Sequence, residues 1–231
     1  MTGVVGRGMP LGTRCGVGKR DQTVQRLLEV AGTTYAAEAG IRIDDKPMPL
    51  FQLLTLCMLA SKPIDAAIAT GAAHELFKAG LRTPRAVLAS DRQTMIDAFG
   101  RAHYARYDES SATRLTDMAE LVRDEYSGDL RGLADRSRHD VAEAKRMLKV
   151  FKGIGDTGAD IFLREVQDVW PWVRPYFDDR ATAGAKQLGL PSQPETLGSL
   201  APRENSRLAA ALVRVLLDDE VRRQVTGLTQ P

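Results

Sequence analysis

Cysteine is scarce in this chain, and histidine hardly more common. The 231 residues contain two cysteines, Cys15 and Cys57, and three histidines. Neither cysteine has the spacing of a metal ligand, and the histidines share no helical face. We therefore expect no metal site and no cofactor, and a fold that is held together by packing alone.

Long apolar runs and an excess of one charge are also missing. No segment approaches the length of a membrane span, and the N-terminus has no signal-peptide hydrophobic region. With 32 basic and 30 acidic residues the net charge is +2, so composition demands no particular partner. These features are typical of a globular protein, and we expect no membrane partner and a cytoplasmic location.

Sustained strand alternation is absent too, and the apolar residues instead recur at helical spacing. Leu50, Leu53, Leu54 and Met58 form one broad apolar stripe, which predicts a buried helix entered through Pro49. Capping-box patterns that start at Ser90 and Ser137 predict two further helix starts. The glycine-rich and basic residues 1 to 20 predict a flexible tail, and residues 189 to 202 a loop. The fold class should be all-α.

The most informative segment lies between two helical patterns, at Gly153-Ile154-Gly155. Two glycines around one apolar residue predict a tight hairpin whose second helix begins with unpaired backbone amides. Such a helix end binds phosphate, and glycine lets a nucleic-acid backbone approach closely. Lys152 at the turn would neutralise phosphate charge. The segment therefore predicts a DNA-backbone contact.

Together with the downstream Phe177-Asp178-Asp179-Arg180, these residues resemble the helix-hairpin-helix DNA glycosylases related to endonuclease III. Upstream, Pro49 to Leu54 and Ala60 to Asp65 look like the first barrel helix of that family and the turn after it. The resemblance implies two helical lobes: a six-helix barrel over residues 47 to 168 with the helix-hairpin-helix, and a second lobe from residues 21 to 46 and 169 to 231. An extruded base would lie between the lobes. The iron–sulfur cluster of many relatives needs four cysteines near the C-terminus, and this chain has none after Cys57.

The resemblance makes Asp178 the candidate catalytic carboxylate. Breaking a glycosidic bond builds positive charge on the sugar, which a nearby carboxylate stabilises while it orients water. Asp179 is the alternative within the same motif. Either residue could also simply cap the helix that follows, since aspartate is common at this position.

Other positions match the family less closely. Thr157 stands where bifunctional members have a nucleophilic lysine, so the resemblance implies a glycosylase without lyase activity. Arg180 takes the place of the family's histidine, Lys152 that of the hairpin proline, and Gly158 that of a threonine. Lys62 lies where relatives insert a side chain into the gap left by the flipped nucleotide. The aromatic residues at 170, 172, 176 and 177, and Tyr104 and Tyr107, could either stack on a base or pack in the core.

Two functions follow from these observations. The first is a monomeric, nucleoid-associated base-excision repair enzyme that binds double-stranded DNA containing a lesion or mismatch, flips the base and hydrolyses its bond with Asp178. The second is a helix-hairpin-helix protein that binds DNA without catalysis, in which Asp178 is a cap. Nothing in the sequence identifies the base.

Overall fold

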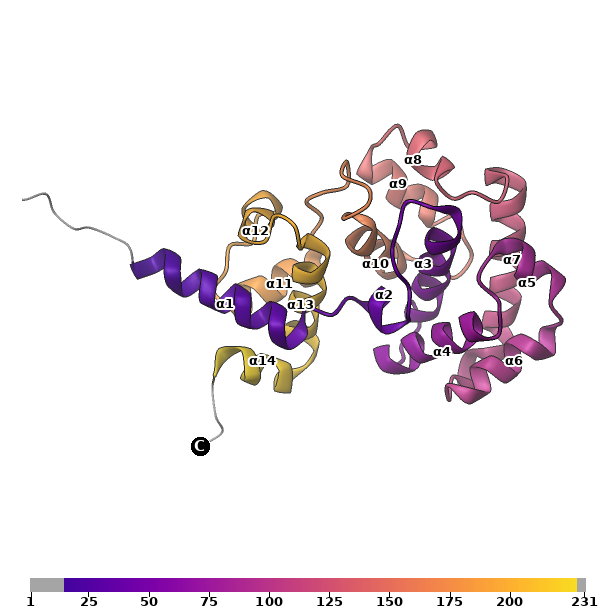
Figure 1. Ribbon diagram of the computed structural model, residues 1–231, viewed down its shortest axis with the longest axis horizontal. Helices are drawn as coiled ribbons and strands as arrows, with labels where there is room; N and C mark the ends of the chain where they lie inside the picture. Colours follow the sequence, from indigo (N-terminus) through magenta and orange to yellow (C-terminus); the bar gives the residue numbers. More distant parts are fainter. Residues whose placement is uncertain (1–14, 228–231) are drawn as a thin grey trace, which may run out of the picture.

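The computed structural model describes residues 15–227, and its regular structure is helical throughout this range. No β-strand occurs within these residues, so the predicted all-α class is confirmed. Figure 1 shows two groups of helices that lie side by side. We refer to them as the larger group, at the right of the figure, and the smaller group, at its left.

The larger group runs without interruption from α2 to α10. Its elements are α2 (Tyr35–Glu38), α3 (Pro47–Ala60), α4 (Ala66–Lys78), α5 (Pro84–Ala89), α6 (Arg92–Arg101), the short 3₁₀ helix Ala105–Tyr107, α7 (Asp108–Tyr126), α8 (Gly132–Arg136), α9 (Val141–Leu148) and α10 (Asp156–Val166). Helix α3 is apolar on all sides and is buried from Pro49 to Leu59, which places it at the centre of this group. It packs against α4, α7 and α10.

The smaller group combines the two ends of the described chain. It contains α1 (Cys15–Ala31), α11 (Asp179–Gln187), α12 (Pro194–Leu200), α13 (Asn205–Leu217) and α14 (Asp219–Thr226). Helix α13 is its centre and packs against α1, α11 and α14, and also against α10 of the larger group. The guanidinium groups of Arg207 and Arg214 donate to carbonyl oxygens at and just beyond the end of α1, which fixes that helix on α13.

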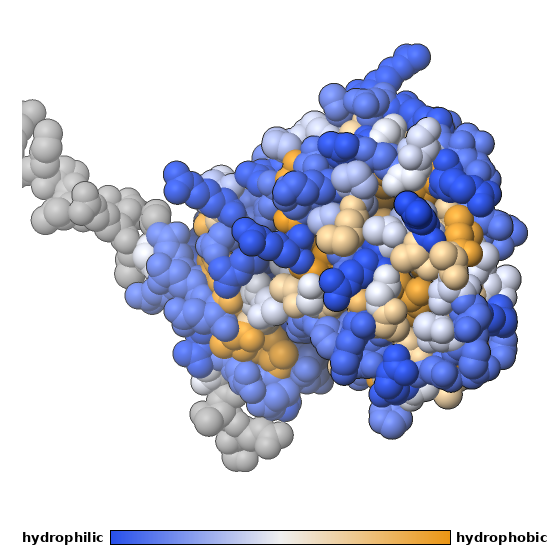
Figure 2. All heavy atoms as spheres, turned by 45° about the vertical axis from the view of Figure 1, so that its right-hand side comes forward, coloured by the Kyte–Doolittle hydropathy of each residue, from blue (hydrophilic) through white to orange (hydrophobic). Residues whose placement is uncertain are grey.

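Each group has its own hydrophobic core. The larger core includes Tyr35 to Ile41, Trp170 and Val173, although the predicted second lobe contains these positions. The division into a six-helix barrel and a second lobe remains a prediction. On the face shown in Figure 2, hydrophilic side chains cover most of the surface and apolar patches are small. The most exposed large hydrophobic side chains of the described residues are those of Val150 and Leu217.

Three local predictions need correction. The loop expected over residues 189 to 202 contains α12, which begins at Pro194 because proline suits the first turn of a helix. The capping side chains are those of Asp91 and Asp140 rather than the serines that open the predicted capping boxes, and each accepts a backbone N–H three residues later. Of the tail predicted over residues 1 to 20, positions 1–14 lie outside the described residues, and 15–20 form the first turns of α1.

Contact between α11 and α13 yields a stability prediction. A Cβ atom at Gly184 would lie 2.0 Å from the carbonyl oxygen of Leu212, so Gly184→Ala must push the two helices apart. We expect it to lower the free energy of unfolding by about 1–3 kcal/mol or more. In the control Gly71→Ala, in α4, the new Cβ would meet nothing closer than Ala102 at 3.9 Å. The higher helix propensity of alanine should raise the free energy of unfolding of this control by at most about 1 kcal/mol. Urea denaturation of both variants checks this; equal stabilities would contradict it.

Candidate functional site

The hairpin turn between α9 and α10 is held by its apolar residues. Phe151 and Ile154 are buried, and the amide of Ile154 donates to the carbonyl of Phe151 over 3.0 Å. Gly153 has a φ of +93°, and a Cβ there would lie 2.8 Å from Arg114 Cδ. Gly155 is exposed and has no atom within 4 Å of where a Cβ would be. Gly153 is therefore required by the turn itself, whereas Gly155 leaves the surface open to an approaching molecule.

The two lysines beside the turn are already paired within the protein. Lys149 Nζ lies 2.7 Å from Asp156 Oδ1, and Lys152 Nζ lies 3.0 Å from Asp117 Oδ2. The hydrogen bond from Lys149 lowers the pKa of Asp156 below its usual value. Gly155 offers no side-chain cap to α10. The anion-binding capacity of this end therefore depends on the first backbone amides of α10 and on the lysines, which a phosphate would have to draw from their carboxylates.

A cavity of about 410 Å³ lies at the junction of the two groups. Its walls come from α2, α3 and α4, the turn between α3 and α4, α10, α11 and α13. The lining residues are Tyr35, Leu56, Ala60, Ser61, Lys62, Pro63, Ile64, Ala66, Thr70, Thr157, Ile161, Arg164, Arg180, Val213 and Leu217. Three predicted site residues, Lys62, Thr157 and Arg180, meet here although they are far apart in sequence.

The charged residues of the cavity lining are all basic: Lys62, Arg164 and Arg180. The ammonium of Lys62 also lies 5.5 Å from the centre of the Tyr107 ring. Hydroxyl groups of Ser61 and Thr70 donate to backbone carbonyls, so they offer acceptor oxygens rather than hydrogens to the cavity. The strong donors that face a ligand are therefore the three cations.

Asp178 lies behind the cavity wall, where it forms a buried ion pair with Arg164. Its Oδ2 lies 2.6 Å from Arg164 Nη1, and the two side chains are 6% and 3% exposed. Its Oδ1 accepts the backbone N–H of Ala181 at 3.0 Å, which makes Asp178 the N-cap of α11. Asp178 is not among the lining residues and reaches the cavity through Arg164. Asp179, the alternative carboxylate, is exposed at the first residue of α11.

The neighbour of Arg164 in α10 holds a different part of the chain. Glu165 is 3% exposed, and its two carboxylate oxygens accept the backbone N–H groups of Tyr35 and Ala36 over 3.2 and 3.0 Å. Burial raises the pKa of this carboxyl group. Arg214 covers the Tyr35 ring with its guanidinium 4.3 Å from the ring centre. Glu165 thus fixes the start of α2 and places Tyr35 in the cavity wall.

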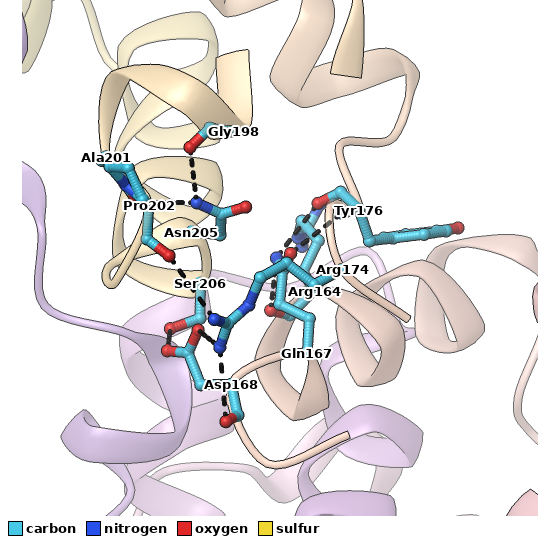
Figure 3. A network of polar contacts seen from close by, with 10 residues as sticks. All are labelled: Arg164, Gln167, Asp168, Arg174, Tyr176, Gly198, Ala201, Pro202, Asn205 and Ser206. Atoms are coloured by element: carbon cyan, nitrogen blue, oxygen red, sulfur yellow. Dashed lines mark hydrogen bonds and ion pairs between the residues drawn. The ribbon is translucent and has the colours of Figure 1, made fainter. Parts of the chain in front are cut away.

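The segment that leads from α10 to Asp178 is fixed by the polar network in Figure 3. The side-chain amide of Gln167 donates to the carbonyl of Tyr176 and accepts the Tyr176 backbone N–H over 2.9 Å. Asp168 accepts hydrogen bonds from Arg174 and from Ser206 of α13. Asn205 donates to the carbonyls of Gly198 and Ala201. These contacts set the position of Asp178 relative to α10.

The aromatic residues near the site pack within the protein rather than facing the cavity. Trp170 is 2% exposed and stacks on Trp172, and both line a different cavity with Tyr126 and His139. Phe177 is buried, and the Tyr104 hydroxyl lies 3.3 Å from the carbonyl of Leu59. Core packing is therefore the role of Trp170, Phe177 and Tyr104. The aromatic side chain that does line the cavity between the two groups is that of Tyr35.

Sequence reasoning missed Arg164, although the sequence contained a signal for it. Arg164 interrupts an apolar helical run, and an arginine at such a position needs a buried partner. It also follows Thr157 by two helical turns and so shares its face. The departure at Gly158 has a packing reason, because a Cβ there would lie 2.3 Å from Ser61 Oγ.

Comparison with known proteins finds no matching family model, no matching curated protein and no matching solved structure. Among residues 15–227, no helix is long and apolar enough to cross a membrane. Within the same residues, no group of three or more histidine, cysteine or acidic side chains is arranged to hold a metal ion. The site must therefore be interpreted from its own geometry.

Replacing Arg164 tests how much the intact buried ion pair matters for the free energy of unfolding. Arg164→Met leaves Asp178 buried without its counter-charge, and we expect the free energy of unfolding to fall by about 3–5 kcal/mol. The double variant Arg164→Met/Asp178→Asn removes both charges while the asparagine can still cap α11, so it should recover part of the loss.

A control for this experiment lies in α14, where Arg222 pairs with Asp219 at the surface over 2.5 Å. Arg222→Met should cost less than about 1 kcal/mol. Chemical denaturation of the four proteins provides the comparison. A similar small loss for Arg164→Met and Arg222→Met would contradict the importance of the buried pair.

Proposed function

We propose that this protein is a DNA glycosylase that extrudes a damaged or mismatched base from double-stranded DNA and hydrolyses its N-glycosidic bond. The observation that carries the proposal is the convergence of Lys62, Thr157 and Arg180 on one cavity, with Asp178 directly behind its wall. These residues come from three separate segments of the sequence: the turn between α3 and α4, helix α10, and the start of α11. All of them belong to a single chain, so a monomer is sufficient for the activity.

Each part of the site has a role in this proposal. The open surface at Gly155 and the first amides of α10 receive a backbone phosphate, with Lys152 beside them. The flipped base enters the cavity between the helical groups, and Lys62 enters or braces the gap that it leaves. Asp178 stabilises the positive charge that develops on the sugar and orients the attacking water. A carboxylate has about four acceptor positions, so the bonds to Arg164 and Ala181 leave others free.

The proposed enzyme cleaves the N-glycosidic bond, releases the base and leaves the sugar–phosphate strand intact. A lyase needs an amine that forms a Schiff base with the opened sugar, and Thr157 has none to offer. The lysine of the cavity lining, Lys62, is placed beside the gap in the stack rather than beside Asp178 in this proposal. The product is therefore an abasic site in a continuous strand.

A second candidate is a helix-hairpin-helix protein that binds DNA without catalysis. It is favoured by a specific observation: both carboxylate oxygens of Asp178 already accept a hydrogen bond, one from Arg164 and one from the α11 backbone. In this interpretation Asp178 is only the cap and the counter-charge. The two candidates differ in what Asp178→Asn does.

An excision assay separates the two candidates. Duplexes that carry uracil, an alkylated purine, an oxidised base or a mismatch are incubated with the wild type, Asp178→Asn and the neighbouring control Asp179→Asn. Because Asp178→Asn leaves Arg164 buried without its counter-charge, the assay is run at a temperature at which circular dichroism shows that the variant is folded. Under these conditions we expect Asp178→Asn to keep DNA binding and to lower excision by about 10²–10³-fold, because one electrostatic stabiliser is lost. Asp179→Asn should remain active.

The reaction products complete this test. Strands treated with the wild type should break only after alkali or an abasic endonuclease is added. Nicking with a borohydride-trapped adduct would show an amine nucleophile, and full activity in Asp178→Asn would remove the residue from the reaction. Binding of every duplex without excision of any base would favour the second candidate.

Gly155 tests the hairpin contact with DNA. Gly155→Leu adds a side chain where the protein leaves open space, so the fold should be kept, while backbone approach is blocked. We expect weaker binding to every duplex alike in titrations at fixed salt, because phosphate contacts are independent of sequence. The control Gly100→Leu changes an equally unobstructed exposed glycine in α6 and should bind normally. Unchanged affinity in Gly155→Leu would remove the hairpin from the interface.

A further inference from the structure

The charges that line the cavity between the two groups limit which bases can react there. Lys62, Arg164 and Arg180 line the cavity, and no acidic residue does. Arg164 is 3% exposed, and its Nε–H has no hydrogen-bond partner. Among the described residues, no acidic side chain forms an ion pair with Lys62 or Arg180 within 4.0 Å, so their positive charge is available to a ligand.

During hydrolysis, positive charge develops on the sugar and negative charge develops on the departing base. The bond between sugar C1′ and the base nitrogen breaks with both electrons moving to the base. The oxygen of a water molecule bonds to C1′ as a hydroxyl group, and the remaining proton ends on the departing base if that base leaves as an anion, or in the solvent if it leaves as a neutral molecule. A neutral base therefore becomes an anion before it is protonated, whereas a base already made cationic by N-alkylation leaves as a neutral molecule.

The two charges that develop match the two sides of the site. Asp178 lies behind the wall, on the side that the proposed function assigns to the sugar, and its charge offsets that of Arg164. The net positive charge around the space for the base therefore comes from Lys62 and Arg180, while Arg164 contributes its remaining N–H groups. Arg164 is buried, where fixed N–H groups act more strongly than in water, whereas Lys62 is half-buried and Arg180 is exposed, so solvent partly screens their charges. The same cations oppose the entry of a positively charged base.

We propose that the cavity selects bases that are neutral in DNA, present carbonyl oxygens and depart as anions, and that Arg180 and Arg164 stabilise the departing base. Uracil and oxidised pyrimidines belong to this class, and cationic alkylated purines do not. This inference rests on the proposed glycosylase function. Arg164 is held in place by Asp178, so its remaining N–H groups are fixed before the base arrives.

Single-turnover excision from one duplex sequence tests the selection. The target position carries uracil, 5-fluorouracil or 7-methylguanine. We expect the wild type to remove both uracils faster than 7-methylguanine. Arg180→Gln should slow uracil excision about tenfold or more, and 5-fluorouracil excision less, because the fluorinated anion is a better leaving group. Excision of 7-methylguanine should not fall. The control Lys186→Gln changes a residue of the same helix that is exposed like Arg180 but does not line the cavity, and it should behave like the wild type.

Two results of this assay would overturn the inference while leaving the glycosylase function in place. One is faster removal of 7-methylguanine than of uracil. The other is an equal loss on all three substrates in Arg180→Gln, which would mean that the cations hold a DNA phosphate rather than the base.

A binding measurement keeps the inference testable if no base is excised and the proposed function fails. Isothermal titration compares barbiturate, a planar pyrimidine anion with several carbonyl groups, with inorganic phosphate. We expect saturable binding of barbiturate that weakens at least about fivefold in Arg180→Gln and is unchanged in Lys186→Gln. Binding of phosphate without barbiturate, or of neither, would overturn the selection for a carbonyl-bearing anion.

Discussion

The buried ion pair between Arg164 and Asp178 is the interaction on which the arrangement of the site depends. It joins the C-terminal half of α10, in the larger group, to the N-cap of α11, in the smaller group. The next residue, Glu165, holds the start of α2 through two backbone amides. Adjacent residues of one helix therefore fix both places at which the chain passes between the groups. Buried charges of this kind stabilise little by themselves, but the loss of one partner is costly, so the geometry that pairs them is strongly enforced.

This arrangement explains how the cavity wall can contain a buried arginine. Asp178 neutralises Arg164 from behind, which allows a guanidinium to remain buried in the wall without an acidic residue inside the cavity. Arg180 follows two residues after Asp178 and extends from the same helix start. One N-cap thus orients the helix, fixes one cation and positions another.

The parts of the fold that were predicted from sequence are those that local patterns determine. The apolar stripe of α3 and the Gly153-Ile154-Gly155 turn depend on residues close together in the chain, and helical period and glycine chemistry are sufficient for them. Helix α12 lies in the segment predicted as a loop because proline and glycine, here Pro194 and Gly198, generally favour loops. In the structure Pro194 begins the helix, and at Gly198 a Cβ would lie 2.8 Å from Pro175, so the glycine serves packing.

The cavity could be predicted only in part. Lys62, Thr157 and Arg180 were identified from a resemblance, but nothing local in the sequence brings them together, since that needs the packing of α10 against α3 and α13. Arg164 was not identified because its partner lies across a connection whose path is set by Gln167, Tyr176 and Ser206. Contacts of this kind depend on tertiary structure, which periodicity does not specify.

The helices of the smaller group come from both ends of the described chain, and this affects the order in which the protein can fold during synthesis. All buried residues of the larger core except Ala210 lie between Tyr35 and Val173. This core can therefore form while the residues that follow it are still being synthesised. Helix α1 leaves the ribosome before the larger group, yet Val24, Leu27 and Ala31 belong to the core that is built around α13, which emerges after the larger group. Its apolar side therefore stays without its native partner for most of translation. A helix that is synthesised before the larger core thus reaches its final position only after the residues of that core have been made.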